Sequence, residues 1–265
     1  MRKSAAVLLI SIALLLLLAG FVAPHPYATQ FRETTNAAAS RHFLLGTDGL
    51  GRDRFSRMLY GGRISLLCAP AAALVSSLMA LLIALAAGCL GRRAEQLAGV
   101  AADVCLSLPW LFALLAVRAV LPLNAAPWAG VLATFGLLGL LGWAGPARVI
   151  LAAVKRQLGS DFILFARANG ASGWRVATVH LLPNLLPLVC AQFLVTVPAF
   201  LLAEANLGLL GLGIPEPIPS LGGLLRELEN LPGAVAHPWM FVPALLLFAV
   251  VSSFHLLVSA DKYSV

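Results

Sequence analysis

The sequence predicts an all-α protein that crosses a membrane six times. Of its 265 residues, 60% are hydrophobic and only 11% are charged, whereas soluble domains carry about 25% charged residues. The apolar residues also gather in uninterrupted blocks of the length, about 20 residues, that crosses a hydrocarbon core about 30 Å thick. Helices satisfy their own backbone hydrogen bonds in lipid, and the alternating pattern of a membrane β-barrel does not occur. The bilayer is therefore the expected solvent for most of the chain.

With the N-terminus taken as inside, the apolar blocks divide the chain into an N-terminal transmembrane helix, an external segment and a core of five further helices, with bounds 1–23, 24–63 and 64–265. The first block follows Arg2 and Lys3 as a secretion signal would, but it exceeds the 7 to 15 apolar residues of a signal, so we interpret it as an uncleaved span. An even number of spans places both termini on one side. The predicted spans are 5–23, 64–90, 97–121, 127–150, 185–212 and 238–260.

The formal net charge of +7 does not indicate a nucleic-acid-binding protein. The arginines lie in the short segments between apolar blocks, which suits contact with lipid headgroups, and they form no basic face. With the N-terminus inside, ten lysines and arginines lie in inner segments and eight lie in outer ones. This difference is too small to fix the orientation by the positive-inside rule.

The sequence lacks the motifs of nucleotide, metal and dinucleotide sites. No GxxxxGK[ST] pattern occurs among its three lysines, so we expect ATP to be bound by another chain. Histidines and cysteines are scattered without the spacing of metal ligands, so no metal site is expected.

One string has the form of an intramembrane serine protease. Gly170–Gly173 reads GxSG around Ser172, and His255 in the last span is a conceivable base. However, Arg167 and Arg175 flank the string, which places Ser172 in a polar loop outside the apolar core. We therefore favour a turn over a protease, because a motif counts only in its structural setting. A stand-alone secondary transporter is a second alternative.

The segment 151–184 is the most informative polar segment of the chain. Ser160 is placed to cap a helix that starts at Asp161, and Gly170 is placed to end it in a left-handed conformation. Ser172 is placed to cap a second short helix that runs to Leu182, before Pro183. Two short helices at an angle are expected.

The first of these helices would expose Phe162, Ile163 and Phe165 outside the membrane. Exposing such apolar side chains to water is unfavourable in free energy unless another surface covers them. They fit a helix that docks into a partner's groove, with Arg167 and Arg175 orienting it, or a helix that folds back onto the lipid headgroups. The residue types leave these two interpretations open.

This loop resembles that of the inner-membrane permeases of binding-protein-dependent ABC importers, in the dipeptide, oligopeptide and nickel subfamily. Their signature is EAA, a glycine three residues later and a LeuPro further on, and the chain matches it at Ala166, Gly170, Ala171, Ser172, His180, Leu182, Pro183 and Asn184. Further matches follow in family order, at Leu45–Asp48, Gly51–Asp53, Gly61, Arg63–Ser65, Asp103 with Pro109, Ala203–Leu207, Leu210–Gly213, Pro217, Pro219 and Ser220.

The resemblance implies the type I importer permease fold and a non-catalytic subunit of the cell inner membrane with both termini cytoplasmic. It implies a second permease subunit, two cytoplasmic ATPase subunits or domains that bind ATP and Mg²⁺, and an external solute-binding protein. The expected solute is a di- or oligopeptide, nickel or another small solute. It also implies that the 161–183 loop couples to the ATPase, through Asp161, Phe162, Phe165, Ala166, Arg167, Gly170, Ala171, Ser172 and Pro183.

The loop departs from the signature at one important position. Leu164 replaces the glutamate of EAA and Phe165 replaces the alanine that follows, so the usual carboxylate contact to the ATPase is missing. Coupling would then depend on burial of apolar side chains.

Two further groups of residues are candidates for a role. Glu204 lies in the fifth span, where an unpaired acid near mid-membrane costs about 2.5 to 3.5 kcal/mol, and we slightly favour a structural hydrogen bond over a functional role. Asp48, Arg52 and Asp53 lie in the external segment. They are expected either to contact the solute-binding protein or to pair with one another on the surface, where ion pairs contribute little.

Overall fold

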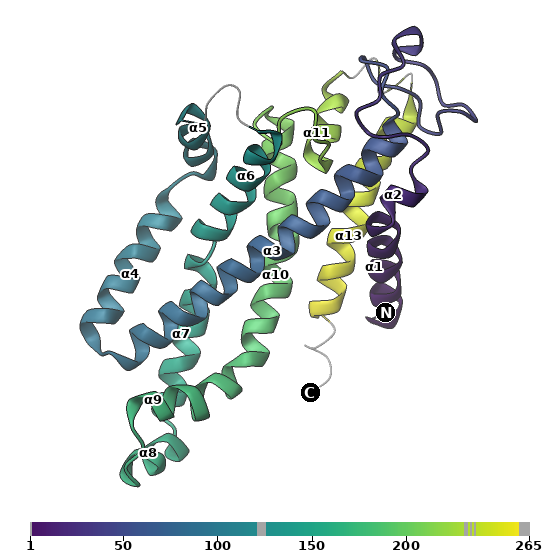
Figure 1. Ribbon diagram of the computed structural model, residues 1–265. Coiled ribbons are helices and arrows are strands. Elements are labelled where there is room, and N and C mark those ends of the chain that lie inside the picture. The colour runs from purple at the N-terminus through teal and green to yellow at the C-terminus, as the bar shows by residue number, and fades with distance from the viewer. Residues whose placement is uncertain (1, 121–125, 231–232, 234, 236, 260–265) are drawn as a thin grey trace.

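A computed structural model describes residues 2–120, 126–230, 233, 235 and 237–259 (Figure 1). The described residues form helices joined by turns, with one isolated β-bridge between Thr47 and Asp53 and no strand. The all-α prediction is confirmed. The predicted ends of the third and last spans, at 121 and 260, lie outside the described residues.

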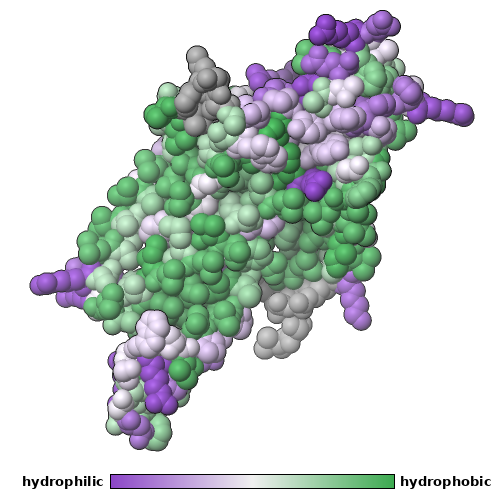
Figure 2. Space-filling model, viewed as in Figure 1, coloured by the Kyte–Doolittle hydropathy of each residue, from purple (hydrophilic) through white to green (hydrophobic). Residues whose placement is uncertain are grey.

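Four helical stretches in the described part are long and apolar enough to cross a membrane: Arg54–Cys89, Pro127–Leu158, Gly173–Leu209 and Pro238–Val258. The N-terminal block forms α1 (Arg2–Leu17) and the short α2 (Ala19–Val22), which are separated at Leu18. Figure 2 shows that hydrophobic residues cover the middle of the visible face of the bundle, with hydrophilic residues toward its two ends. The arrangement is that of a multi-pass membrane protein.

The second and third spans differ from the predicted ones. Helix α3 (Arg54–Cys89) begins ten residues earlier than predicted, because Asp53 accepts hydrogen bonds from the backbone N–H groups of Phe55 and Ser56 and so caps it. The third span is two helices, α4 (Arg92–Ser107) and α5 (Trp110–Val120). The break falls at Leu108, whose extended backbone is the conformation favoured before Pro109.

The fourth and fifth spans are longer than the apolar blocks that predicted them, and the last span begins at the predicted residue. Helices α6 (Pro127–Leu141) and α7 (Ala144–Leu158) follow each other with a break at 142–143, and α10 (Leu182–Leu209) continues the helical stretch that starts at Gly173. The last span is a 3-10 turn, η4 (Pro238–Phe241), followed by α13 (Val242–Ser259).

Helix α3 is the centre of the bundle and crosses it obliquely, in contact with α6, α7 and α10 (Figure 1). Its buried face is built from small side chains, which let neighbouring helices approach closely. On α6, Gly139 faces the backbone of Ala72, whereas Gly136 faces open space. Close packing therefore explains the glycine at 139 but not the one at 136.

The segment between the predicted fifth and sixth spans, 213–237, contains a buried helix, α11 (Leu221–Arg226). This helix packs against α3, α10 and α13, and Leu221, Gly222, Leu224 and Leu225 are buried. Glycines permit this: a Cβ added to Gly208 on α10 would lie 2.2 Å from the carbonyl carbon of Gly222. This segment is therefore partly inserted into the bundle.

Gly208→Val is expected to destabilise the protein strongly, because the added side chain would meet backbone rather than a movable side chain. Overpacking of a close-packed interior typically costs about 1 to 3 kcal/mol. The midpoint of thermal unfolding in detergent should fall by several degrees, or folded protein should be lost. The matched control is Gly136→Val, since nothing lies within 4 Å of a Cβ there. Equal midpoints for the two variants would contradict this account of α11.

The bundle has two distinct ends (Figure 1). One end carries α8 (Asp161–Ala168) and α9 (Gly173–Arg175), and the first turn of α1 and the last turn of α13 point toward it. We call this the loop end. The opposite end carries residues 24–53 and 213–230, which we call the polar cap.

Candidate functional site

The α8–α9 loop, residues 159–182, is the candidate site at the loop end. Helix α8 begins at Asp161 as predicted, and this acidic residue suits the positive end of the helix dipole. The predicted cap is wrong in one respect: Ser160 has the extended backbone of a capping residue, but its Oγ donates to the carbonyl oxygen of Gln157 instead of accepting from α8.

Helix α8 ends at the predicted glycine. Gly170 has a φ of 81°, the left-handed conformation that glycine adopts without strain. Its N–H donates to the Arg167 oxygen at 2.9 Å, and the N–H of Ala171 donates to the Ala166 oxygen at 3.0 Å. These two bonds close the end of the helix in a Schellman motif, which fixes the direction in which the chain leaves α8.

The second helix begins as predicted but does not end where expected. Ser172 Oγ accepts from the N–H of Arg175 at 3.3 Å, which caps α9. The helix then continues through one π-helical turn, η2 (Val176–Leu181), directly into α10, so Pro183 does not end it. The N–H of Leu182 donates to Ala177, five residues back. Pro183 has no backbone N–H to donate. It lies where the hydrogen-bond pattern changes from five residues back to four residues back, so its missing donor removes little helical hydrogen bonding.

The side chains of α8 divide into one anchor and an exposed apolar surface. Ile163 is fully buried in the core with α7 and η2, so the expectation that it is exposed is wrong. Phe162, Leu164 and Phe165 are 46%, 52% and 73% exposed. Beside them is a surface hollow of about 420 Å³, lined by Phe162, Phe165, Ala166, Asn169, Ala171, Arg175 and His180. A rigid helix therefore presents apolar groups next to a hollow with a basic rim.

Gly170→Val is expected to disturb this presentation. Nothing lies within 4 Å of an added Cβ, so the cost comes from the left-handed backbone, which is strained for a β-branched residue. We expect about 1 to 3 kcal/mol of strain, relieved by a shift of the turn, and a severalfold loss of ATP-driven transport with normal membrane insertion. Gly173→Ala is the control, because Gly173 starts a helix and also faces open space. Wild-type transport in Gly170→Val would contradict the role given to the turn.

The polar cap contains a second cluster, built around a tight turn at 48–52. Asp48 Oδ1 accepts from the N–H groups of Leu50 and Arg52, both at 2.9 Å, and Gly51 has a φ of 73°. The turn brings Arg52 back onto Asp48, with Nε to Oδ2 at 2.7 Å. The local sequence thus positions a buried guanidinium.

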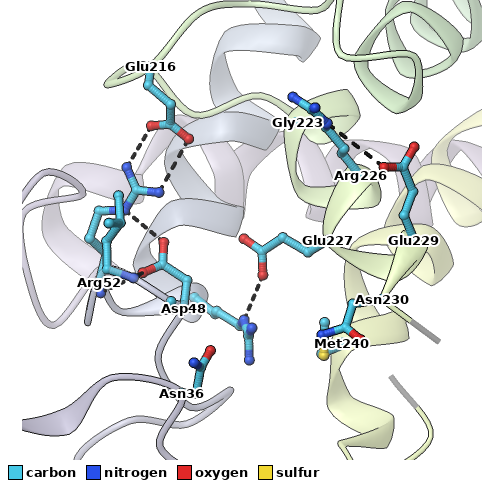
Figure 3. Close-up of a pocket in the computed structure, with 13 residues that line it drawn as sticks. Asn36, Asp48, Arg52, Glu216, Gly223, Arg226, Glu227, Glu229, Asn230 and Met240 are labelled. Carbon is cyan, nitrogen blue, oxygen red and sulfur yellow. Dashed lines mark hydrogen bonds and ion pairs between the residues drawn. The ribbon is translucent and has the colours of Figure 1, made fainter. Parts of the chain in front are cut away.

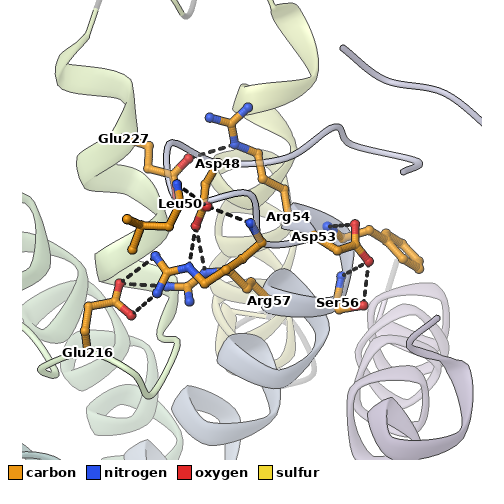
Figure 4. Close-up of polar contacts among 10 residues, drawn as sticks. Asp48, Leu50, Asp53, Arg54, Ser56, Arg57, Glu216 and Glu227 are labelled. Carbon is orange, nitrogen blue, oxygen red and sulfur yellow. Dashed lines mark hydrogen bonds and ion pairs between the residues drawn. The ribbon is translucent and has the colours of Figure 1, made fainter. Parts of the chain in front are cut away.

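This guanidinium joins two parts of the chain that are far apart in sequence (Figures 3 and 4). Arg52 Nη1 and Arg57 Nη2 donate to the two carboxylate oxygens of Glu216 at 2.6 and 2.8 Å. Arg54 Nε donates to Glu227 at 2.8 Å. Burial alone would lower the pKa of Arg52, but its hydrogen bonds to Glu216 and Asp48 and their charges raise it above its usual value. We call Asp48, Arg52, Arg57 and Glu216 the cap ion cluster.

The structure corrects the expectation for the external residues. Asp48, Arg52 and Asp53 are only 3%, 7% and 3% exposed, so the Asp48–Arg52 pair is buried rather than on the surface, and Asp53 caps α3 instead of joining that pair. The reason is that the turn folds inward against α3 and the segment after α10. An open groove of about 620 Å³ lies above them, with Arg226, Glu227 and Glu229 on its rim (Figure 3).

Glu204 has the structural hydrogen bonds that we favoured. Its carboxylate is fully buried and accepts from Ser65 Oγ on α3 at 3.2 Å and from the N–H of Gly222 on α11 at 3.3 Å. The acid therefore joins α3, α10 and α11 at one point.

A comparison with known protein families identifies the family to which this chain belongs. The family described as binding-protein-dependent transport system inner membrane component matches residues 78–260, which include the whole α8–α9 loop. The chain belongs to this family. It is a non-catalytic permease subunit of ABC importers, as the resemblance implied.

Curated relatives of this permease have peptide-transport names. The dipeptide transport system permease protein DppC of Bacillus subtilis is 31% identical over 239 residues, covering 89% of this chain and 72% of that protein. The oligopeptide transport system permease protein OppC of the same strain is 30% identical, covering 92% and 78%. The di/tripeptide transport system permease protein DppC of Pseudomonas aeruginosa is 31% identical, covering 91% and 79%.

Family membership removes both alternatives. Ser172 of this permease uses its Oγ as a helix cap, in a loop that Figure 1 places far from α13 and hence from His255, so the protease interpretation is wrong. A transporter without an ATPase is also excluded by the family. The sequence reasoning did not find Arg57, Glu216 and Glu227. One signal was available: several arginines crowd residues 52–63, and such a group needs carboxylate partners elsewhere.

Proposed function

We propose that this permease forms half of the translocation pathway for di- or oligopeptides and couples to a cytoplasmic ATPase through the α8–α9 loop. The loop end is then cytoplasmic, with both termini, and the polar cap faces outward. A second permease, two ATPase subunits or domains that bind ATP and Mg²⁺, and an external solute-binding protein complete the complex. The observation that carries the proposal is the exposed apolar surface of α8, held in place by Ile163 and the Gly170 turn.

Coupling in this permease depends on apolar burial. Leu164 is exposed beside Phe162, where the family signature has a glutamate, and Asp161 is the one acidic residue of α8. Burying a large apolar side chain contributes about 1.5 to 3 kcal/mol, so two or three of them suffice for stable docking. Arg167 and Arg175, both exposed, supply orientation toward an acidic rim of the ATPase groove.

Peptides are the proposed solutes because the relatives named above are peptide permeases. Uptake of nickel or another small solute instead of peptide is the alternative result of the uptake experiment. The groove of the polar cap, with its exposed Arg226 and Glu229, supports a role in contacting the solute-binding protein, a role for which Asp48, Arg52 and Asp53 are too buried.

Cross-linking in the assembled complex tests the coupling. In a variant whose native cysteines are replaced by alanine, Phe165→Cys should form a short bismaleimide cross-link to the ATPase. Leu50→Cys, at a position that is also exposed, at 51%, but lies in the polar cap, should not. A cross-link from Leu50→Cys and none from Phe165→Cys would reverse the proposed orientation.

A further inference from the structure

Two ion pairs join α4 to α7 on the outside of the bundle. Near the loop end, Lys155 Nζ lies 2.7 Å from Glu95 Oε1. Further along both helices, Arg148 pairs with Asp103. The side chains of Asp103 and Arg148 are 71% and 49% exposed, so this second pair lies on the surface of the subunit.

This second pair lies further into the membrane than the first. Asp103 is eight residues beyond Glu95 on α4 and Arg148 is seven residues before Lys155 on α7, which corresponds to about 10 to 12 Å at about 1.5 Å per residue. Both charges are thus about a third of the 30 Å hydrocarbon thickness beyond the Glu95–Lys155 pair. Charged groups at this depth rarely face lipid and usually face a water-filled cavity or another protein surface.

The exposed surface of α4 is itself divided into two stripes. Gln96, Asp103 and Ser107 are exposed and, at 3.6 residues per turn, lie within about 40° of one another. Leu97, Val104 and Leu108 are also exposed and form an apolar stripe about 100° away, with Val100 at the border. The apolar stripe suits lipid and the polar stripe does not.

The polar stripe opens into a cavity at the loop end. This cavity of about 650 Å³ lies between the end of α3, the start of α4 and the end of α7, and Gln96 and both members of the Glu95–Lys155 pair line it. Polar groups of the stripe therefore lie at this cavity and, two turns further into the membrane, at Asp103 and Ser107, with Gly99 and Val100 on the turn between them.

We propose that this stripe of α4 lines the translocation pathway and that Asp103 and Arg148 contact the solute there. A carboxylate and a guanidinium side by side are complementary to a solute with both an ammonium and a carboxylate group, as a short peptide with free termini has. Asp103 binds the ammonium group of the solute and Arg148 binds its carboxylate. These two contacts replace the ion pair between Asp103 and Arg148. This inference rests on the proposed function, because it takes the solute to be a peptide.

Cysteine accessibility in the assembled importer tests the pathway. Single cysteines at positions 96, 103 and 107, in a background without native cysteines, should react with a charged, membrane-impermeant methanethiosulfonate at least fivefold faster than cysteines at 97 and 104. A saturating transported peptide should slow labelling at 107, one turn from Asp103 on the same stripe, at least threefold. Labelling at 103 no faster than at 104 would overturn the inference, since lipid or the partner permease would then cover the stripe. Labelling that peptide does not slow would overturn the solute contact.

Peptide uptake by a variant that lacks the charge of Asp103 completes the test. Asp103→Asn should reduce peptide uptake at least tenfold with the complex still assembled, whereas Val104→Ala on the apolar stripe should change uptake less than twofold. Equal uptake by wild type and Asp103→Asn would overturn this inference alone. If the wild-type complex imports Ni²⁺ and no peptide, the proposed solute fails, while the labelling pattern still reports whether α4 lines the pathway.

Discussion

Phe165→Asp is expected to uncouple ATP hydrolysis from import. Phe165 is the most exposed of the apolar side chains on α8, at 73%, and we place it in the ATPase groove. Replacing it removes about 1.5 to 3 kcal/mol of apolar burial and forces a carboxylate to lose its hydration. The affinity of the loop for the ATPase should therefore fall about tenfold to a hundredfold or more. Peptide uptake should fall at least tenfold, while ATP hydrolysis loses its stimulation by the solute-loaded binding protein.

Two controls separate docking from folding. Phe165→Leu keeps an apolar side chain and should retain most of the uptake. Ile163→Asp, by contrast, would bury a charge in the core and reduce the amount of folded subunit, which size-exclusion chromatography detects. Wild-type coupling in Phe165→Asp would show that α8 does not dock through this face.

Arg52→Ala is expected to have the largest effect on stability. It leaves Asp48, whose side chain is 5% exposed, without its closest cation and removes one of the two guanidinium groups from Glu216. Breaking a buried ion pair by removing one partner typically costs about 3 to 5 kcal/mol. The free energy of unfolding in mixed micelles should fall by about 3 kcal/mol, and the polar cap should become sensitive to protease before the rest of the chain.

Arg226→Ala is the matched control for this variant. It removes the same charge from the same end of the bundle, but Arg226 and its partner Glu229 are both 58% exposed, and such pairs contribute about 0 to 1 kcal/mol. Similar losses for the two variants would mean that the cap ion cluster is not what holds the 24–53 segment against the segment after α10.

Features set by local sequence were predictable. The start of α8 at Asp161 and its end at Gly170 follow from the dipole and the left-handed conformation, which need no other part of the chain. The apolar blocks likewise predicted the four helical stretches that are long and apolar enough to cross a membrane, since a single segment in hydrocarbon satisfies its own backbone hydrogen bonds only as a helix. The error at Ile163 was avoidable: at about 100° per residue, it lies on a different side of the helix from Phe162 and Phe165, which are three residues apart.

Features set by contacts between distant segments were not predictable. Arg52 and Glu216 are 164 residues apart in sequence, and no local pattern pairs them. The burial of α11 depends on Gly208 facing Gly222, so that a segment polar enough to be taken for a loop packs inside the bundle. The start of α3 at Arg54 was missed for a related reason: hydropathy marks the part of a helix in lipid, whereas Asp53 caps the part beyond it.

The central claim is that this chain is a subunit of an ATP-driven peptide importer, and solute uptake into proteoliposomes tests it most directly. The complex of this permease, its partner permease, the ATPase and the binding protein is reconstituted, and short peptides and Ni²⁺ are supplied separately, with and without ATP inside. We predict saturable peptide uptake that requires both ATP and the binding protein. Uptake driven by an ion gradient without ATP, or uptake of Ni²⁺ with no uptake of peptide, would contradict the claim.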